Sequence, residues 1–261
     1  GPAMEAEMKP AGQSSYALPP SPICSEDILF CIDAGSESLS EMKSTAPGGR
    51  AIIRLDSIKQ AVLLFVHSKL SINSTHRFAL ASFSRTPSWL RKEFTSNVDS
   101  VITGLRGLSV SSSPSSGKPD LTQLFQEVAC EAKKSRAQNR ILRLILIYCR
   151  SSSVPQYHWP VGPKLFTLDV VYLHDKPGPD NCPQAVYDAL VEALEVVSEH
   201  EGYIFESGQG LQRSLFRHIC TLLAHPQQRC FQENLVAPKS FTKKSSEIVS
   251  VGKECGSSSG Q

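Results

Sequence analysis

Asp27-Ile-Leu-Phe-Cys-Ile-Asp33-Ala-Gly-Ser-Glu37 is the stretch of sequence that decides the fold. Its apolar run, Ile28 to Ile32, ends in an aspartate and a turn of small residues, which is typical of a strand buried on both faces of a parallel sheet. Open α/β sheets bind their ligands at the carboxyl ends of such strands. Asp33 therefore either helps to hold a ligand, such as a metal ion, or is the remnant of such a site.

Apolar runs and helical periodicity alternate along the rest of the chain. This alternation predicts one α/β unit with a mainly parallel central sheet and helices on both faces. The segment 88–95 is more polar than the other strand segments, and we expect it to be the single antiparallel edge strand. The expected strands are 28–32, 77–84, 88–95, 141–149, 165–173 and 203–206, and the expected helices are 51–70, 97–108, 120–136, 186–197 and 211–223.

The composition divides the chain into three parts. Residues 1–22 begin with an apparent tag scar, Gly1-Pro2-Ala3, and are expected to be a disordered leader. Residues 23–226 are expected to form the single domain. Residues 227–261 lose periodicity and are expected to be a C-terminal tail that begins with a partner-binding segment and then becomes disordered.

Charge and cysteine content narrow the function. The formal net charge of +2 gives no support for nucleic-acid or membrane-surface binding, and no apolar stretch is long enough to span a bilayer. The eight cysteines form no Cys-x-x-Cys pair. Zinc binding and a disulfide framework are therefore both disfavoured, and a reducing compartment is expected.

The strand-end aspartate and the order of elements resemble those of von Willebrand factor A domains. That family binds Mg²⁺ through Asp-x-Ser-x-Ser, a Thr and a second Asp, because hard oxygen ligands suit this ion. The positions that match this set here are Asp33, Gly35, Glu37, Pro119 and Cys149, and Arg150 adds a positive charge beside them. Since only one of the five family residues is retained, we expect a degenerate site that binds no metal.

Other catalytic sites are also disfavoured. A phosphatase that used Cys149 as its nucleophile would need an arginine six residues later, where Pro155 stands. Gly208-Gln209-Gly210 lacks the rest of a dinucleotide fingerprint and is interpreted as a turn. His225 lacks the companion residues of a zinc-dependent deubiquitinase. We therefore expect no enzyme activity, no catalytic residue and no cofactor.

Four stretches in the same order resemble the BRISC and BRCA-A complex member one family, over roughly residues 24 to 230. These stretches are 78–83, 147–150, 169–174 and 222–229. The resemblance implies a non-catalytic, von Willebrand A-like scaffold of lysine-63-specific deubiquitinase complexes that act in DNA-damage and ubiquitin signalling, in the nucleus and the cytoplasm. The implied partner is a subunit with ubiquitin-E2-variant domains and, through it, the zinc-dependent deubiquitinase and an Abraxas-like subunit.

The start of the tail is the candidate partner-binding segment. It offers an apolar anchor and a guanidinium fork to a partner groove. The residues that we expect to take part are His225, Pro226, Gln228, Arg229 and Phe231, and the alternative is a terminus without a role. The alternative function for the whole domain is a metal-dependent, adhesion-type ligand binder.

Overall fold

The computed structural model describes residues 23–44, 48–111 and 117–235. The expectations for the leader (1–22) and for the end of the tail (236–261) lie outside these residues, as do residues 112–116 of the Ser/Gly/Pro-rich segment 109–118, which is expected to be a linker. The elements in chain order are β1 (Ser25–Asp33), η2 (Ser36–Leu39), β2 (Glu41–Met42), β3 (Ile52–Ile53), α1 (Arg54–Ile72), β4 (Arg77–Phe83), β5 (Pro87–Thr95), α2 (Val98–Arg106), α3 (Thr122–Ala137), β6 (Arg140–Tyr148), β7 (Thr167–Leu173), α4 (Pro183–Val197), β8 (Ile204–Ser207), α5 (Gln212–Thr221), η3 (Pro226–Gln228) and η4 (Gln232–Asn234), where η denotes a 3-10 helix.

A six-stranded sheet in the order β5-β4-β1-β6-β7-β8 forms the centre of the molecule. β1 pairs in parallel with both β4 and β6, so the strand that carries Asp33 lies inside the sheet. Only β5 runs antiparallel, and its pairing with β4 contains register shifts near Leu80. The mainly parallel sheet and its antiparallel edge are therefore confirmed. A small antiparallel pair, β2 with β3, was not expected.

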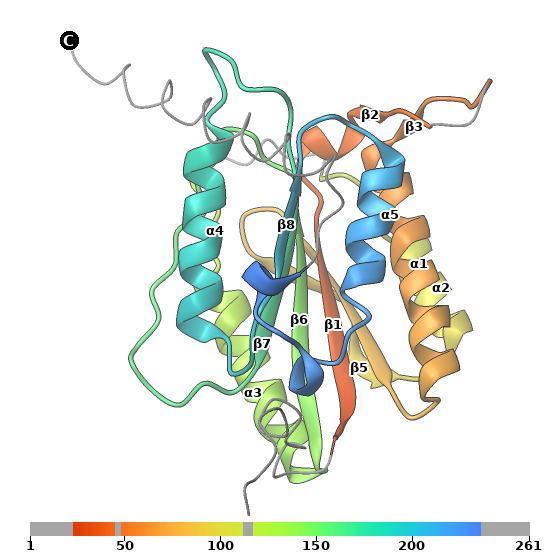
Figure 1. Ribbon diagram of the computed structural model, residues 1–261, viewed down its shortest axis with the longest axis vertical. Coiled ribbons are helices and arrows are strands. Elements are labelled where there is room, and N and C mark those ends of the chain that lie inside the picture. The colour runs from red at the N-terminus through yellow and green to blue at the C-terminus, as the bar shows by residue number, and fades with distance from the viewer. Residues whose placement is uncertain (1–22, 45–47, 112–116, 236–261) are drawn as a thin grey trace, which may run out of the picture.

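Helices cover both faces of the sheet, with α1, α2 and α5 on one side and α3 and α4 on the other (Figure 1). Alternation along β1 explains this arrangement, because successive side chains of a strand point to opposite faces. Phe30 packs with the α1 face, whereas Leu29 and Cys31 pack with the α3 face. Both sets are fully buried, as expected for a central parallel strand.

Some local expectations need correction. The helix that was expected from residue 51 begins at Arg54, because Ile52 and Ile53 are extended in β3. Asp120 does not occupy the N-cap of α3, which is Leu121, although the carboxylate of Asp120 accepts a hydrogen bond from the Thr122 amide at 2.8 Å. Asn97 does cap α2, since its side chain accepts a hydrogen bond from the Ser100 amide.

Past residue 226 the described chain remains packed against the sheet. Residues 225–235, which we call the C-terminal strap, contain η3 and η4 and lie across the sheet on the α5 side (Figure 1). Leu235 packs against the core of that side. The domain boundary at 226 therefore stays a prediction. Within the described ranges, no helix is both long enough and apolar enough to span a membrane.

Candidate functional site

Asp33 is fully buried at the carboxyl end of β1, where a metal ligand was considered. Its Oδ1 accepts a hydrogen bond from the Gly35 amide at 2.9 Å, and its Oδ2 accepts one from the Cys149 amide at 3.0 Å. The Arg150 Nε lies 3.2 Å from Oδ2 and 3.3 Å from Oδ1. The cation that faces this carboxylate is thus a guanidinium from the end of β6.

Arg150 is held in place by further contacts. Its Nη2 donates to the Ser84 carbonyl, and its guanidinium lies 5.4 Å from the centroid of the Phe83 ring. Its side chain is 8% exposed. A buried arginine with this many partners is fixed in position, because moving it would leave the Asp33 carboxylate uncompensated.

The other positions of the expected metal set do not supply oxygen ligands toward Asp33. A Cβ added at Gly35 would lie 3.1 Å from the Asp33 Oδ1, so the family's serine would be a tight fit that requires Asp33 to move by a few tenths of an ångström. The Glu37 carboxylate is occupied by the Ser151 amide, at 2.9 Å from Oε1, and by the Ser151 hydroxyl, at 2.6 Å from Oε2. Pro119 is buried and offers only its carbonyl, which accepts from the Gln156 amide at 2.9 Å.

Cys149 replaces the second aspartate and is 1% exposed within the apolar core. Burial, aided by the negative charge of Asp33, raises the pKa of its thiol well above the usual range. The neutral thiol is neither a hard cation ligand nor a nucleophile. This donor set does not fit Mg²⁺, and in the described part of the chain no three His, Cys, Asp or Glu residues group as metal ligands would.

The residues expected to bind a partner lie at the opposite end of the sheet, on the C-terminal strap. Arg229 is not available at the surface, because its side chain is fully buried. Its Nη1 and Nη2 each lie 2.6 Å from an oxygen of Asp169, and its guanidinium lies 4.4 Å from the Tyr203 ring centroid. Its fork is thus occupied by a carboxylate of the same chain.

The remaining strap residues fall into two groups. His225 and Pro226 are buried, and His225 uses both ring nitrogens, with Nε2 bonded to the Cys24 carbonyl at 2.7 Å and Nδ1 accepting from the Gln227 amide at 3.1 Å. Gln228 is exposed, and Phe231 is 64% exposed. The structure therefore separates residues that anchor the strap from residues that it presents to solvent.

Arg229 belongs to a buried ionic cluster, Glu26, Lys69, Arg143, Asp169 and Arg229, that was not anticipated. Arg143 donates to both Glu26 oxygens, at 2.9 Å from Nε and 3.0 Å from Nη2, and Lys69 pairs with Glu26. Burial alone would raise the pKa of Glu26, but the charges of Arg143 and Lys69 outweigh it and lower the pKa to about 2. The sequence feature that could have predicted this cluster is the presence of charged residues inside otherwise apolar strand runs.

The chain resembles known proteins in sequence and in fold. No family model matches the chain. BRISC and BRCA1-A complex member 1 of Xenopus tropicalis is 28% identical over 222 residues, which are 81% of this chain and 69% of that protein. Its Homo sapiens counterpart is 25% identical over 264 residues, which are 92% of this chain and 78% of that protein.

Solved structures show a similar fold at low identity. The N-terminal domain of TFIIH p34 has a TM-score of 0.50 and 12% identity, and the match covers 75% of this chain and 96% of that one. The D319A mutant of the PilB minor pilin from Streptococcus sanguinis has a TM-score of 0.52 and 8% identity, over 80% of this chain and 63% of that one. At these identities the likeness concerns the fold alone.

The strand order, the antiparallel edge and the strand-end aspartate define a von Willebrand factor A-like domain, with an arginine facing the aspartate where that class holds a cation. Within this class, the chain is similar in sequence to the BRISC and BRCA1-A complex member 1 proteins, at 25–28% identity. The resemblance indicated by the four sequence stretches is confirmed. The match spans about two thirds of the length of the Xenopus relatives.

Proposed function

We propose that the chain is a non-catalytic scaffold subunit of a BRISC or BRCA1-A type complex, and that it stabilises a lysine-63-specific deubiquitinase. The observation that carries the proposal is the name shared by the relatives, which describes a complex member. The closed strand-end site agrees with it, because the Arg150 guanidinium takes the place of a metal ion beside Asp33 and the neutral Cys149 thiol is not a nucleophile.

The proposed direct partner is the subunit with ubiquitin-E2-variant domains. Through it the chain would be linked to the zinc-dependent deubiquitinase and to an Abraxas-like subunit, in complexes of the nucleus and the cytoplasm that serve ubiquitin signalling and DNA repair. We propose no nucleic-acid, membrane or cofactor binding. The strap supports a contact of this kind, because Phe231 is an exposed aromatic side chain on a backbone that buried residues fix in position.

Reconstitution of the complex tests the proposal. The full chain is co-expressed with the three proposed partners, and we expect it to co-purify with them, to increase the yield of intact complex and to leave lysine-63 diubiquitin uncleaved when it is alone. Assembly with the same yield without the chain, or cleavage by the chain alone, would contradict the scaffold role.

A pair of variants tests the strap within the same assay. Phe231→Asp removes the exposed anchor, and we expect it to lower recovery of the partner subunit at least tenfold. Leu64→Asp, which changes an exposed apolar residue of α1, is the matched control and should leave recovery unchanged. Equal recovery of both variants would remove Phe231 from the interface but would leave the scaffold role to be judged by the complex yield.

A further inference from the structure

The helix layer on the α3 side of the sheet has a gap. β6 and β7 are adjacent and parallel, and a right-handed connection between them passes over this side. That connection, residues 149–166, is described throughout and contains no helix. The layer therefore has α3 and α4 at its two sides and an irregular loop between them, where this architecture normally accommodates a crossover helix.

The loop is firmly attached beneath this gap. Its Gln156 exchanges backbone hydrogen bonds with the segment before α3, donating to the Pro119 carbonyl at 2.9 Å and accepting from the Leu121 amide at 2.8 Å. The rings of Tyr157 and Trp159 lie 5.9 Å and 5.8 Å from the buried Phe125 ring. The floor of the gap is therefore a preformed surface.

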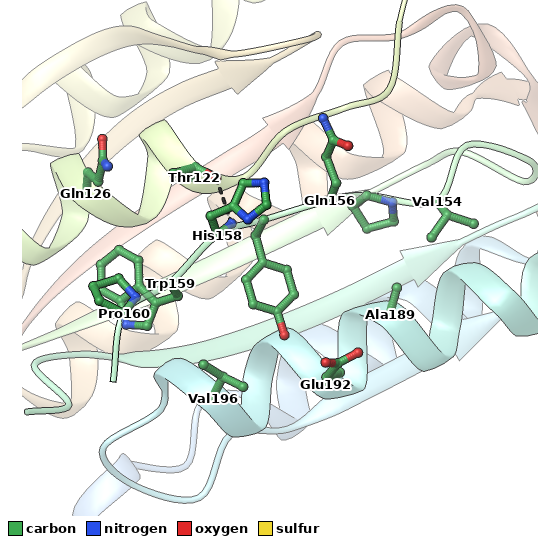
Figure 2. A pocket seen from close by; sticks show the side chains of 12 residues that line it. Thr122, Gln126, Val154, Gln156, His158, Trp159, Pro160, Ala189, Glu192 and Val196 are labelled. Atoms are coloured by element: carbon green, nitrogen blue, oxygen red, sulfur yellow. Dashed lines mark hydrogen bonds between the residues drawn. The ribbon is translucent and has the colours of Figure 1, made fainter. Parts of the chain in front are cut away.

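A groove of about 940 Å³ lies above this floor, between α3 and α4 (Figure 2). Gln126 lines it from α3, and Ala189, Glu192 and Val196 line it from α4, with Trp159 from the loop (Figure 2). Val196 is 38% exposed, and Val161, next to the lining residues of the loop, is fully exposed. Apolar side chains thus remain open to solvent along this groove.

The charge along α4 indicates what the groove would accept. Asp188, Glu192 and Glu195 are all exposed and follow one another at spacings of four and three residues, which places them on one side of the helix. In the described ranges none of these three carboxylates forms an ion pair with a lysine or arginine. Lys164 donates to the backbone carbonyl of Glu195 at 3.0 Å. Glu192 lines the groove and is hydrogen-bonded to Tyr157, and together with its exposed neighbours Asp188 and Glu195 it gives this side of α4 a net negative charge even with Lys164 nearby.

We propose that this groove docks an amphipathic α-helix of a partner protein, with its apolar face toward Trp159 and Val196 and with lysine or arginine along the edge that faces α4. A helix is the expected occupant because the groove lies between two helices of one layer, at the position of a missing crossover helix. Glu192 in the groove, with Asp188 and Glu195 beside it on α4, favours a basic helix and disfavours acidic segments. This inference does not depend on the proposed function.

Peptide display tests the proposal with a defined probe. A phage library of random 16-residue peptides is selected against the full chain and counter-selected against Glu192→Lys/Glu195→Lys. We expect enriched peptides with apolar residues at i, i+3 or i+4, and i+7, and with several lysines or arginines. Their affinity should fall at least tenfold for the double variant and stay unchanged for Glu41→Lys, an exposed charge reversal on β2.

The tryptophans make the binding position measurable. The chain has two, so Trp89→Phe leaves Trp159 as the single fluorescent reporter of the groove. Selected peptides should change its emission, and Val196→Asp should abolish the change in a protein whose circular dichroism is that of the parent. Exchanging the peptide's lysines for glutamates should restore binding to Glu192→Lys/Glu195→Lys, which a merely misfolded variant would not permit.

Several outcomes would overturn the proposal. They are the absence of enriched sequences, enrichment of proline-rich extended peptides or of peptides without basic residues, and binding that the double variant does not weaken. Sedimentation that shows a dimer of the full chain, dissociated by Glu192→Lys/Glu195→Lys, would instead assign the groove to a second copy of this chain.

Discussion

At the scale of single residues, Arg150 explains why Asp33 persists without a metal. The carboxylate accepts hydrogen bonds from two backbone amides and faces a buried guanidinium, so it joins the ends of β1 and β6. Its hydrogen bond from the Gly35 amide also makes it a turn-capping residue. Asp33 thus holds the carboxyl ends of these two central strands together, which is a structural role in place of the coordination of a metal ion.

Asp33→Ala should therefore lower the free energy of unfolding by about 3–5 kcal/mol, because it leaves a buried arginine without its counter-charge. Urea denaturation of the variant measures the loss, and Asp180→Ala, in an exposed loop, serves as the control and should change little. In the double variant Asp33→Ala/Arg150→Ala, the loss should be smaller than the sum of the two single losses. Additive losses would show that the pair is not coupled.

The same pair predicts the response to divalent cations. Because the Arg150 Nε already lies 3.2 Å from the Asp33 Oδ2, a cation there would meet a like charge. Calorimetric titration with millimolar MgCl₂ or MnCl₂ should give no saturable heat, and the melting temperature should match that in NaCl of equal ionic strength. Saturable binding that disappears in Asp33→Ala would favour the adhesion-type alternative.

At the scale of elements, the C-terminal strap completes the edge of the sheet. β8 is an edge strand, and the side-chain amide of Gln232 bonds to both backbone groups of Ile204, with 2.9 Å to the amide and 2.6 Å to the carbonyl. A glutamine side chain thus takes the place of a neighbouring strand. This contact protects backbone groups through which exposed edges pair with other chains.

Gln232→Ala should remove this protection without unfolding the domain. Two hydrogen bonds are lost, at roughly 0.5–1.5 kcal/mol each, and the Ile204 amide and carbonyl lose their side-chain partner. Hydrogen exchange followed by NMR should show a faster Ile204 amide and unchanged amides in β1. Glu233→Ala, exposed on the same 3-10 helix, is the control, and equal exchange in both variants would contradict the role of Gln232.

The helices could be predicted because burial of one face gives their apolar residues a helical period, and the central strands because burial on both faces gives continuous apolar runs. The strap could not, because 3-10 helices of three residues have no period to detect, and its anchors act through side chains distant in sequence. At the strand-end site, the sequence predicted the loss of the metal ligands and a positive charge from Arg150 nearby, but not the direct pairing of Arg150 with Asp33. The residues Gly35, Glu37, Pro119 and Cys149 showed which ligands were missing, whereas the partner of Asp33 depended on how β1 and β6 align.

At the scale of the whole molecule, one ionic cluster links the N-terminal strand to the strap. Glu26 on β1, Lys69 on α1, Arg143 on β6 and Asp169 on β7 meet Arg229, so five segments share buried charges. Removing one charge would leave others uncompensated in a low-dielectric interior. The cluster makes the position of the strap depend on the fold of the entire sheet.

This cluster should make stability depend on pH. The pKa of Glu26 is lowered from 4.5 to about 2, and burial lowers that of the adjacent His76 from 6.5 to about 4. For both groups the unfolded chain binds the proton first as the pH falls. Stability should therefore decrease from about pH 6.5 to 4 through His76, and from about pH 4.5 to 2 through Glu26.

His76→Gln tests the first of these two ranges. His76 is 3% exposed, and its Nδ1 accepts from the Glu26 amide at 3.0 Å, so it is held neutral while Glu26, Lys69, Arg143 and His225 surround it. At about 1.4 kcal/mol per pKa unit, its share of the decrease between pH 7.5 and 4.5 is roughly 2–3 kcal/mol. The variant should lose that share in urea titrations at each pH, while His67→Gln, at an exposed position of α1, should follow the parent. A parent-like profile for His76→Gln would show that His76 does not couple protonation to the integrity of the cluster.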